Sequence, residues 1–271
     1  MSEVQYNSNE QKINKALYAR SEILTRHTRR KEDDIFFCLP LIADAMGNKA
    51  NEKDRIGWHY LRDMFYKWLA GEANDVPQNN PNPFWVDIDW VLSYEKAEEQ
   101  WKYALQNRIL NENAHKEIKA HLIELGYLAE KRTEFDFINI PFSEWDKHHY
   151  QHISVEFSES DIIFSGLSGL YVSLGNFTFK FLAKGKILYT ENDFDIQIEQ
   201  AAGFVYDLFN FHGDQDYGYW SCEKKNVQYT PWDSYTSMNN EKFNLFREYN
   251  KIGNDFVVLS NQKIIDIQSI K

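Results

Sequence analysis

The hydrophobic pattern of this 271-residue chain changes near Lys131. Before that point apolar residues recur every three or four positions, most clearly in residues 56–70, a pattern that predicts amphipathic helices. After it, short segments rich in β-branched and aromatic residues favour strands. Because helix patterns precede strand patterns, we predict an α+β fold, with a helical N-terminal half packed on a mainly antiparallel β-sheet formed by the C-terminal half.

The same patterns predict three segments. Residues 1–34 form an N-terminal helical extension, residues 35–132 a helical subdomain, and residues 133–271 a β-rich subdomain with one late helix at 240–250. We expect the three segments to fold as one cooperative unit.

Glycines and prolines predict where several elements end. Gly71 follows the helix at 56–70, where a left-handed cap is common, and Gly126 closes a helix at 112–125. The proline-rich residues 74–83 predict an irregular loop. Residues 184–186, Lys-Gly-Lys, lie between two strand patterns and predict a tight hairpin.

The charge of the chain is acidic and uneven. The net charge is −11, and residues 133–271 carry 20 acidic against 11 basic side chains. Because contact with a nucleic acid backbone depends on Lys and Arg, no nucleic-acid partner is expected. The first twelve residues do not resemble a secretory signal, so we expect a cytoplasmic location in the producing cell, with secretion by a signal-peptide-independent route as an option.

Two further features have competing interpretations. Cys38 and Cys222 lack the neighbours of a zinc site or a redox pair, and we interpret them as buried free thiols. Residues 162–183 carry one charge in twenty-two positions, enough to span a bilayer, but their glycines, serines and alternating phenylalanines favour buried strands. Membrane insertion is therefore not expected.

Six blocks of sequence resemble one bacterial family, the domain of unknown function 6402, in the same order along the chain. The blocks are LPLIADAM (39–46), GWHYLRDMFYKWLAG (57–71), DIDWVLSYEKAEEQW (87–101), LGNFTFKF (174–181), GFVYDLFNFHGDQDYGYWS (203–221) and FNLFREYNKIGNDFVVLSN (243–261). Phe246 stands where the family usually has Trp, and Asn254 where Gly is usual.

Genes of this family are often found beside type VI secretion components and effectors. The resemblance therefore implies an interbacterial weapon or its accessory, with a secretion spike or adaptor protein and a cognate immunity protein as partners. It supplies no accepted catalytic residues and no cofactor.

Residues 203–222 combine aromatic side chains with acids around a Gly-Asp turn, which predicts a strand pair with an acidic tip. The candidate catalytic residues are Asp207, His212, Asp214 and Asp216, because crowded carboxylates raise one another's proton affinity. The alternative is that these acids only solvate a turn.

The candidate binding residues are Tyr206, Tyr217, Trp220, Arg247 and Asp255. Arg247 is the only arginine after Arg132, and we expect it to pair with Asp255 or Asp207, more as a buried structural ion pair than as a substrate anchor. The aromatic residues could stack on sugar rings, although core packing is the default.

The histidines at 148, 149 and 152 do not complete a recognised metal motif, so no metal site is predicted. Three functions remain open. The first is a type VI secretion cargo effector, an antibacterial toxin with an unassigned activity, possibly on the cell envelope. The second is a non-enzymatic immunity factor or effector adaptor, and the third is membrane insertion through residues 162–183. Whether the chain is an enzyme stays undecided.

Overall fold

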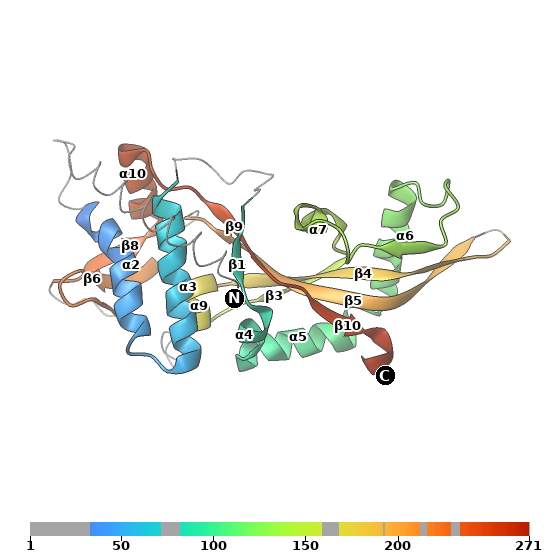
Figure 1. Cartoon of the computed structure of the whole chain (residues 1–271), viewed down its shortest axis with the longest axis horizontal. Coiled ribbons are helices and arrows are strands. Elements are labelled where there is room, and N and C mark those ends of the chain that lie inside the picture. The colour runs from blue at the N-terminus through green and yellow to red at the C-terminus, as the bar shows by residue number, and fades with distance from the viewer. Residues whose placement is uncertain are drawn as a thin grey trace, which may run out of the picture. The chain divides into compact units, whose positions relative to one another are not determined.

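The structure is a computed structural model that describes residues 33–71, 82–158, 168–191, 193–211, 216–228 and 234–270 (Figure 1). In chain order its elements are α2 (Asp34–Gly47), α3 (Glu52–Leu69), β1 (Phe84–Val86), α4 (Ile88–Leu92), α5 (Glu95–Asn107), α6 (Glu112–Glu124), β2 (Glu134–Asp136), α7 (Phe142–His148), β3 (Gln151–Val155), α9 (Gly169–Leu174), β4 (Phe177–Tyr189), β5 (Phe194–Phe209), β6 (Asp216–Ser221), β7 (Asn226–Gln228), β8 (Thr236–Asn239), α10 (Asn240–Asn250), β9 (Phe256–Ser260), β10 (Lys263–Asp266) and the 3-10 helix η2 (Ile267–Ile270). Helices dominate the first half and mostly antiparallel strands the second, so the α+β prediction is confirmed.

The chain divides into two compact units, each assembled from three separate stretches. The first unit comprises Met1–Phe84, Ser158–Gly175 and Leu208–Val257, and the second comprises Trp85–Phe157, Asn176–Asp207 and Val258–Lys271. The boundaries fall inside β1, β5 and β9. Each unit therefore draws residues from both sides of position 132, where the sequence pattern changes.

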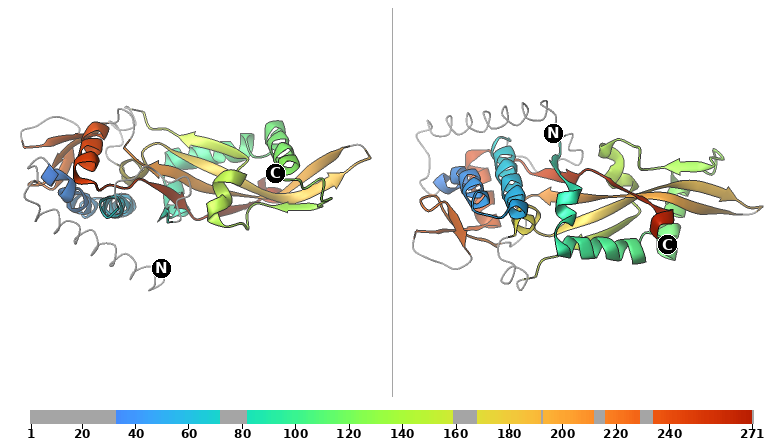
Figure 2. Two further views of the ribbon diagram at one scale, coloured as in Figure 1. Left: turned by 90° about the horizontal axis from the view of Figure 1, so that it is seen from above. Right: turned by 60° about the horizontal axis from the view of Figure 1, so that its bottom comes forward.

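In the first unit, α2 and α3 pack side by side (Figure 2). The side chain of Asn51 caps α3 by accepting the Asp54 N–H at 3.0 Å, and the predicted apolar face, including Trp58 and Trp68, is buried. The helix ends at Ala70 in a right-handed conformation, so the predicted left-handed cap at Gly71 is wrong. Gly71 is instead required for space, because a Cβ there would lie 2.2 Å from the Cβ of Asn254.

Helix α9 crosses α3 in the same unit through a contact between two glycines. A Cβ on Gly57 would lie 2.2 Å from the carbonyl oxygen of Gly169. The strand prediction for residues 162–183 is therefore wrong over α9 and confirmed from Phe177 onward, where β4 begins, while residues 162–167 lie outside the described residues. In the described part of the chain, none of the helices combines the length and the apolar character that a bilayer crossing demands.

The described strands form two sheets. The large sheet has the order β1-β9-β5-β4-β2, with β10 paired to β5 and β3 paired to β4, and the small sheet has the order β7-β6-β8. Strands β5 and β6 thus belong to different sheets, so the strand pair predicted for residues 203–222 is wrong. The physical reason is that β4 offers β5 a long antiparallel register, from Thr178 opposite Tyr206 to Tyr189 opposite Phe194.

The hairpin predicted at residues 184–186 is also wrong. Strand β4 continues through these residues, and its register with β5 shifts between Lys184 and Gly185, as at a β-bulge. A Cβ on Gly185 would lie 2.0 Å from the carbonyl oxygen of Gln197, so this glycine permits close approach of two strands and makes no reversal.

Two helices of the second unit cover opposite faces of the β4–β5 pair (Figure 1). Trp101 of α5 packs on Phe179 and Phe181, with ring centroids 5.1 and 5.2 Å away, and Trp145 of α7 packs on Phe204 at 5.0 Å. Register partners on neighbouring antiparallel strands lie on the same face of the sheet, and successive residues of one strand lie on alternate faces. The contacts of Trp101 and Trp145 are therefore on opposite sides of the sheet. Gly203 makes room for α5, because its Cβ would lie 2.2 Å from the Trp101 ring.

Two predicted helices are confirmed, whereas α7 is an additional helix in the segment predicted to be β-rich with one late helix. Helices α6 and α10 form where they are predicted, and Gly126 follows α6 with a φ of 76°. Strand β9 follows α10, and the short strand β10 of four residues comes after it.

Candidate functional site

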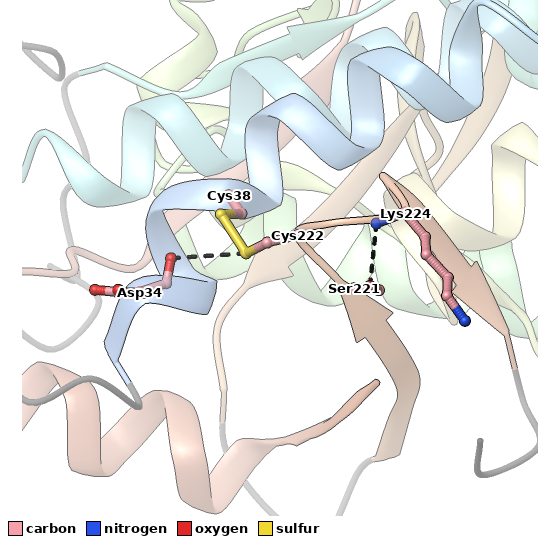
Figure 3. Close-up of a disulfide and its surroundings, with 5 residues drawn as sticks. All are labelled: Asp34, Cys38, Ser221, Cys222 and Lys224. Carbon is pink, nitrogen blue, oxygen red and sulfur yellow. Dashed lines mark hydrogen bonds between the residues drawn. A yellow bond between two sulfur atoms is a disulfide. The ribbon is translucent and has the colours of Figure 1, made fainter. Parts of the chain in front are cut away.

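A disulfide joins Cys38 of α2 to Cys222, which follows β6 in the first unit (Figure 3). The two Cα atoms are 5.6 Å apart, within the usual range for a disulfide, and the cysteines are 184 residues apart in sequence. The interpretation of these cysteines as free thiols is therefore wrong. Their separation hid the pairing, which depends on the fold that brings α2 to the turn between β6 and β7.

The turn that carries Cys222 is held by short-range contacts. The N–H of Lys224 donates to Oγ of Ser221 over 3.2 Å (Figure 3). Sγ of Cys222 also lies 4.0 Å from the carbonyl oxygen of Asp34 in α2, a contact without a hydrogen because the sulfur is in the disulfide. The disulfide thus connects the start of a helix with a well-defined turn.

Arg247 of α10 and Asp255 form a buried two-point ion pair in the same unit. Nη1 of Arg247 donates to Oδ2 of Asp255 over 3.0 Å, and Nη2 donates to Oδ1. The indole Nε1–H of Trp68 donates to Oδ1 as well, over 3.2 Å. The predicted pairing of Arg247 with Asp255 is confirmed.

This ion pair is buried beside the Trp68 ring. The Arg247 guanidinium carbon lies 5.8 Å from the Trp68 ring, and the Asp255 side chain is fully buried. Nε of Arg247 has no hydrogen-bond partner among the described residues. With both charges turned toward each other, the arrangement suits a structural anchor better than a substrate clamp.

The two aromatic binding candidates of β6 also pack inward. Trp220 is 5% exposed and donates its indole N–H to the carbonyl oxygen of Tyr217 over 2.8 Å. The Tyr217 ring lies 5.6 Å from Phe243 of α10, and its hydroxyl donates to Oδ1 of Asn240 over 2.5 Å. These two residues therefore form part of a core, as the default interpretation of the sequence expected.

The acidic candidates are divided between the two units or lie outside the described residues. Asp216 is exposed and accepts the Gly218 N–H over 2.8 Å, which is a turn contact. Asp207 lies at the end of the second unit in β5. His212 and Asp214 lie outside the described residues.

Tyr206 belongs to a polar cluster in the second unit that the sequence did not predict. Nζ of Lys180 lies 3.6 Å from the centroid of the Tyr206 ring and pairs with the Asp146 carboxylate at the C-terminal end of α7. His152 is the register partner of Lys180, and its ring lies 5.9 Å from that of His149. We call these five residues the Lys180 patch.

Burial and charge set the protonation of the Lys180 patch. Burial, with smaller contributions from Asp146 and Asp207, raises the pKa of Tyr206, so its hydroxyl stays protonated at neutral pH. Burial, with the Lys180 charge, lowers the pKa of His149, although its Nδ1 lies 2.7 Å from the carbonyl oxygen of Asp146. The patch thus offers an ammonium from Lys180, a phenol from Tyr206 and the neutral imidazole of His149 to a polar ligand.

The histidines at 148, 149 and 152 do not converge. His149 and His152 join the Lys180 patch, whereas His148 lies against His121 of α6. Nowhere among the described residues do three or more His, Cys, Asp or Glu side chains form a group able to hold a metal ion.

Comparison with known proteins gives one family match. Residues 54–231 match the sequence model of a family of unknown function, DUF6402. No curated protein and no solved structure matches the chain.

Proposed function

This chain belongs to the DUF6402 family, and we propose that it is a type VI secretion cargo effector, an antibacterial protein that acts in the envelope of a neighbouring cell. The secretion assignment rests on the resemblance of its six sequence blocks to that family. The chemical activity is not part of the proposal.

The Cys38–Cys222 disulfide is the observation that supports the envelope as the place of action. Disulfides persist in oxidising compartments such as the bacterial periplasm and are rare in the reducing cytosol. A cargo protein made in the cytosol and delivered to the periplasm of a target would form this bond at its destination.

The Lys180 patch is the surface that we propose for contact with the target. Lys180, Tyr206 and His152 lie on one face of the β3–β4–β5 strands, and Asp146 reaches them from α7. This face combines donors and acceptors with an aromatic ring, the usual composition of a site for a polar ligand.

Expression in a sensitive host tests the proposal. The chain is produced with and without an export signal, and we expect growth inhibition only when it reaches the periplasm. A variant with Cys38→Ser and Cys222→Ser should lose most of this inhibition at equal expression, while the patch variant Lys180→Met should lose it with the disulfide intact. Normal growth in both compartments would contradict the proposal.

A non-enzymatic binding protein, either an immunity factor or an effector adaptor, is the second candidate. It is favoured by the structural roles of Trp220, Arg247 and Asp255, which are occupied by contacts within the first unit. Coexpression with a neighbouring toxin gene separates the two functions. An immunity factor would restore growth and copurify with that toxin, whereas an effector would itself require a protecting partner.

A further inference from the structure

His121 of α6 and His148 of α7 form a hydrogen-bonded pair of imidazoles in the second unit. Nε2 of His121 lies 2.8 Å from Nδ1 of His148, and the ring centroids are 5.0 Å apart. A hydrogen bond of this length needs one nitrogen to carry a proton and the other to accept it. The pair therefore holds one shared proton between two helices.

This geometry fits a proton better than a metal ion. The two nitrogens point at each other, whereas metal ligands direct their lone pairs at one ion from about 2.0–2.1 Å each. Oε2 of Glu124 lies 3.7 Å from Nδ1 of His121, the nitrogen that does not face His148.

The pair lines a small pocket of about 160 Å³ between α6 and the residues that join α7 to β3. The His148 ring stacks on Phe137, with centroids 5.1 Å apart and planes inclined by 9°. Phe137 is only 3% exposed. The imidazole of His148 thus covers a buried aromatic ring.

Charged groups reach the pair from each element around it. Glu117 and Glu124 of α6 line the pocket, as do His149 and Tyr150, and Glu144 and Lys147 of α7 act on His148 through their charges. Burial raises the pKa of Tyr150, so this side chain stays neutral. Glu144 favours protonation of His148, and Lys147 opposes it.

We propose that His121 and His148 form a proton-operated latch, which holds α7 to α6 while at most one imidazole is charged and releases it when both are. A first added proton leaves one N–H donor and one lone pair facing each other, and it strengthens the hydrogen bond. A second proton places two N–H groups and two positive charges at the same contact. The bond is then lost and repulsion replaces it.

The protonation behaviour of His148 agrees with this sequence of events. Burial, followed by the charge of His121, lowers its pKa below the ordinary value of 6.5. A histidine whose pKa is lower in the folded state than in the unfolded state favours folding while it is neutral. Its contribution to the free energy of unfolding is complete above about pH 6.5 and is lost as the pH falls through the lowered folded-state pKa. Acidification should therefore open the latch and uncover Phe137.

Hydrogen exchange of the full chain at pH 7.5 and pH 5.0, corrected for intrinsic rates, tests the latch. We expect exchange in α7 and the C-terminal turn of α6 to become several-fold faster at pH 5.0, because loss of the bond allows these segments to open locally. In His148→Gln, which retains a hydrogen-bonding side chain but cannot take up the second charge, this acceleration should disappear. His115→Gln, on the same helix but outside the pair, should behave like the wild type.

Unchanged protection of α7 at pH 5.0, or the same acceleration in His148→Gln, would overturn the latch. Should that variant not fold, the histidine NMR signals of the wild-type chain decide the question. Coupled titration of His121 and His148 supports the latch, and two independent titrations near pH 6.5 contradict it.

Discussion

The indole N–H of Trp68 points at Oδ1 of Asp255, 3.2 Å away, so α3 is tied to a residue 187 positions further along the chain. The same carboxylate receives both terminal nitrogens of Arg247. Three donors therefore converge on one fully buried acid. This arrangement explains why a charged residue is retained in an aromatic core.

Replacing Asp255 by Asn should destabilise the first unit by about 3–5 kcal/mol, because it leaves the buried Arg247 charge without its counterion. The free energy of unfolding in urea measures this change. The matched control is Glu98→Gln, which breaks an exposed pair with Lys102 at 2.7 Å and should cost less than about 1 kcal/mol.

The double variant Arg247→Met with Asp255→Leu separates the cost of an unpaired charge from the value of the pair. It removes both charges and should be closer to the wild type in stability than Asp255→Asn. An equal loss of unfolding free energy in the single and the double variant would mean that lost packing, and not the unpaired charge, causes the destabilisation.

Replacing Cys38 and Cys222 by Ser should lower the free energy of unfolding by about 3–5 kcal/mol, because the disulfide closes a loop of 184 residues in the unfolded chain. Urea unfolding with and without a reductant measures the effect. Reductant should destabilise the wild type and leave the double Ser variant unchanged, and an effect of equal size on both would argue against the bond.

Gly203→Ala should cost about 1–3 kcal/mol, because its Cβ would lie 2.2 Å from the Trp101 ring and the helix would have to shift. Thermal unfolding measures the loss. Combining it with Trp101→Phe, which shortens the opposing ring, should make the added cost of the alanine smaller. If Gly203→Ala lowers stability equally with Trp or Phe at position 101, the loss arises within strand β5 and not from the Trp101 ring.

Asp136 should make stability depend on acid pH. Burial alone would raise its pKa, but hydrogen bonds from Asn139, Lys184 and Ile138 outweigh that effect and lower it. The resulting stability is present above the unfolded value near pH 4 and is lost as the pH falls through the lowered folded value. The stability difference between wild type and Asp136→Asn should therefore be larger at pH 6 than at pH 3.

Several parts of the fold could be read from local sequence, because local patterns determine them. The apolar repeat of α3, the positions of α6 and α10, and the change from helices to strands each depend on neighbouring residues. The ion pair of Arg247 could also be anticipated, since residues 133–271 contain no other arginine.

The errors concern relationships over long distances. Gly185 and Gly71 resemble turn and cap residues in sequence, but each is needed where another backbone or side chain approaches closely. The pairing of Cys38 with Cys222 and of His121 with His148 depends on elements that are distant in the chain. The amino-acid composition of residues 203–222 could not indicate that β5 and β6 pair with different strands and so belong to different sheets.

The chain contributes to each of the two units in turn, and this has a practical consequence for truncation experiments and for folding during translation. Since each unit is closed by residues from three stretches, no single cut yields an intact half, and deletions should be made as internal excisions with linkers. A ribosome must also reach Val257 before the first unit has all of its residues. Helices α2 and α3 therefore emerge long before their partners, with apolar faces that a chaperone would need to shield.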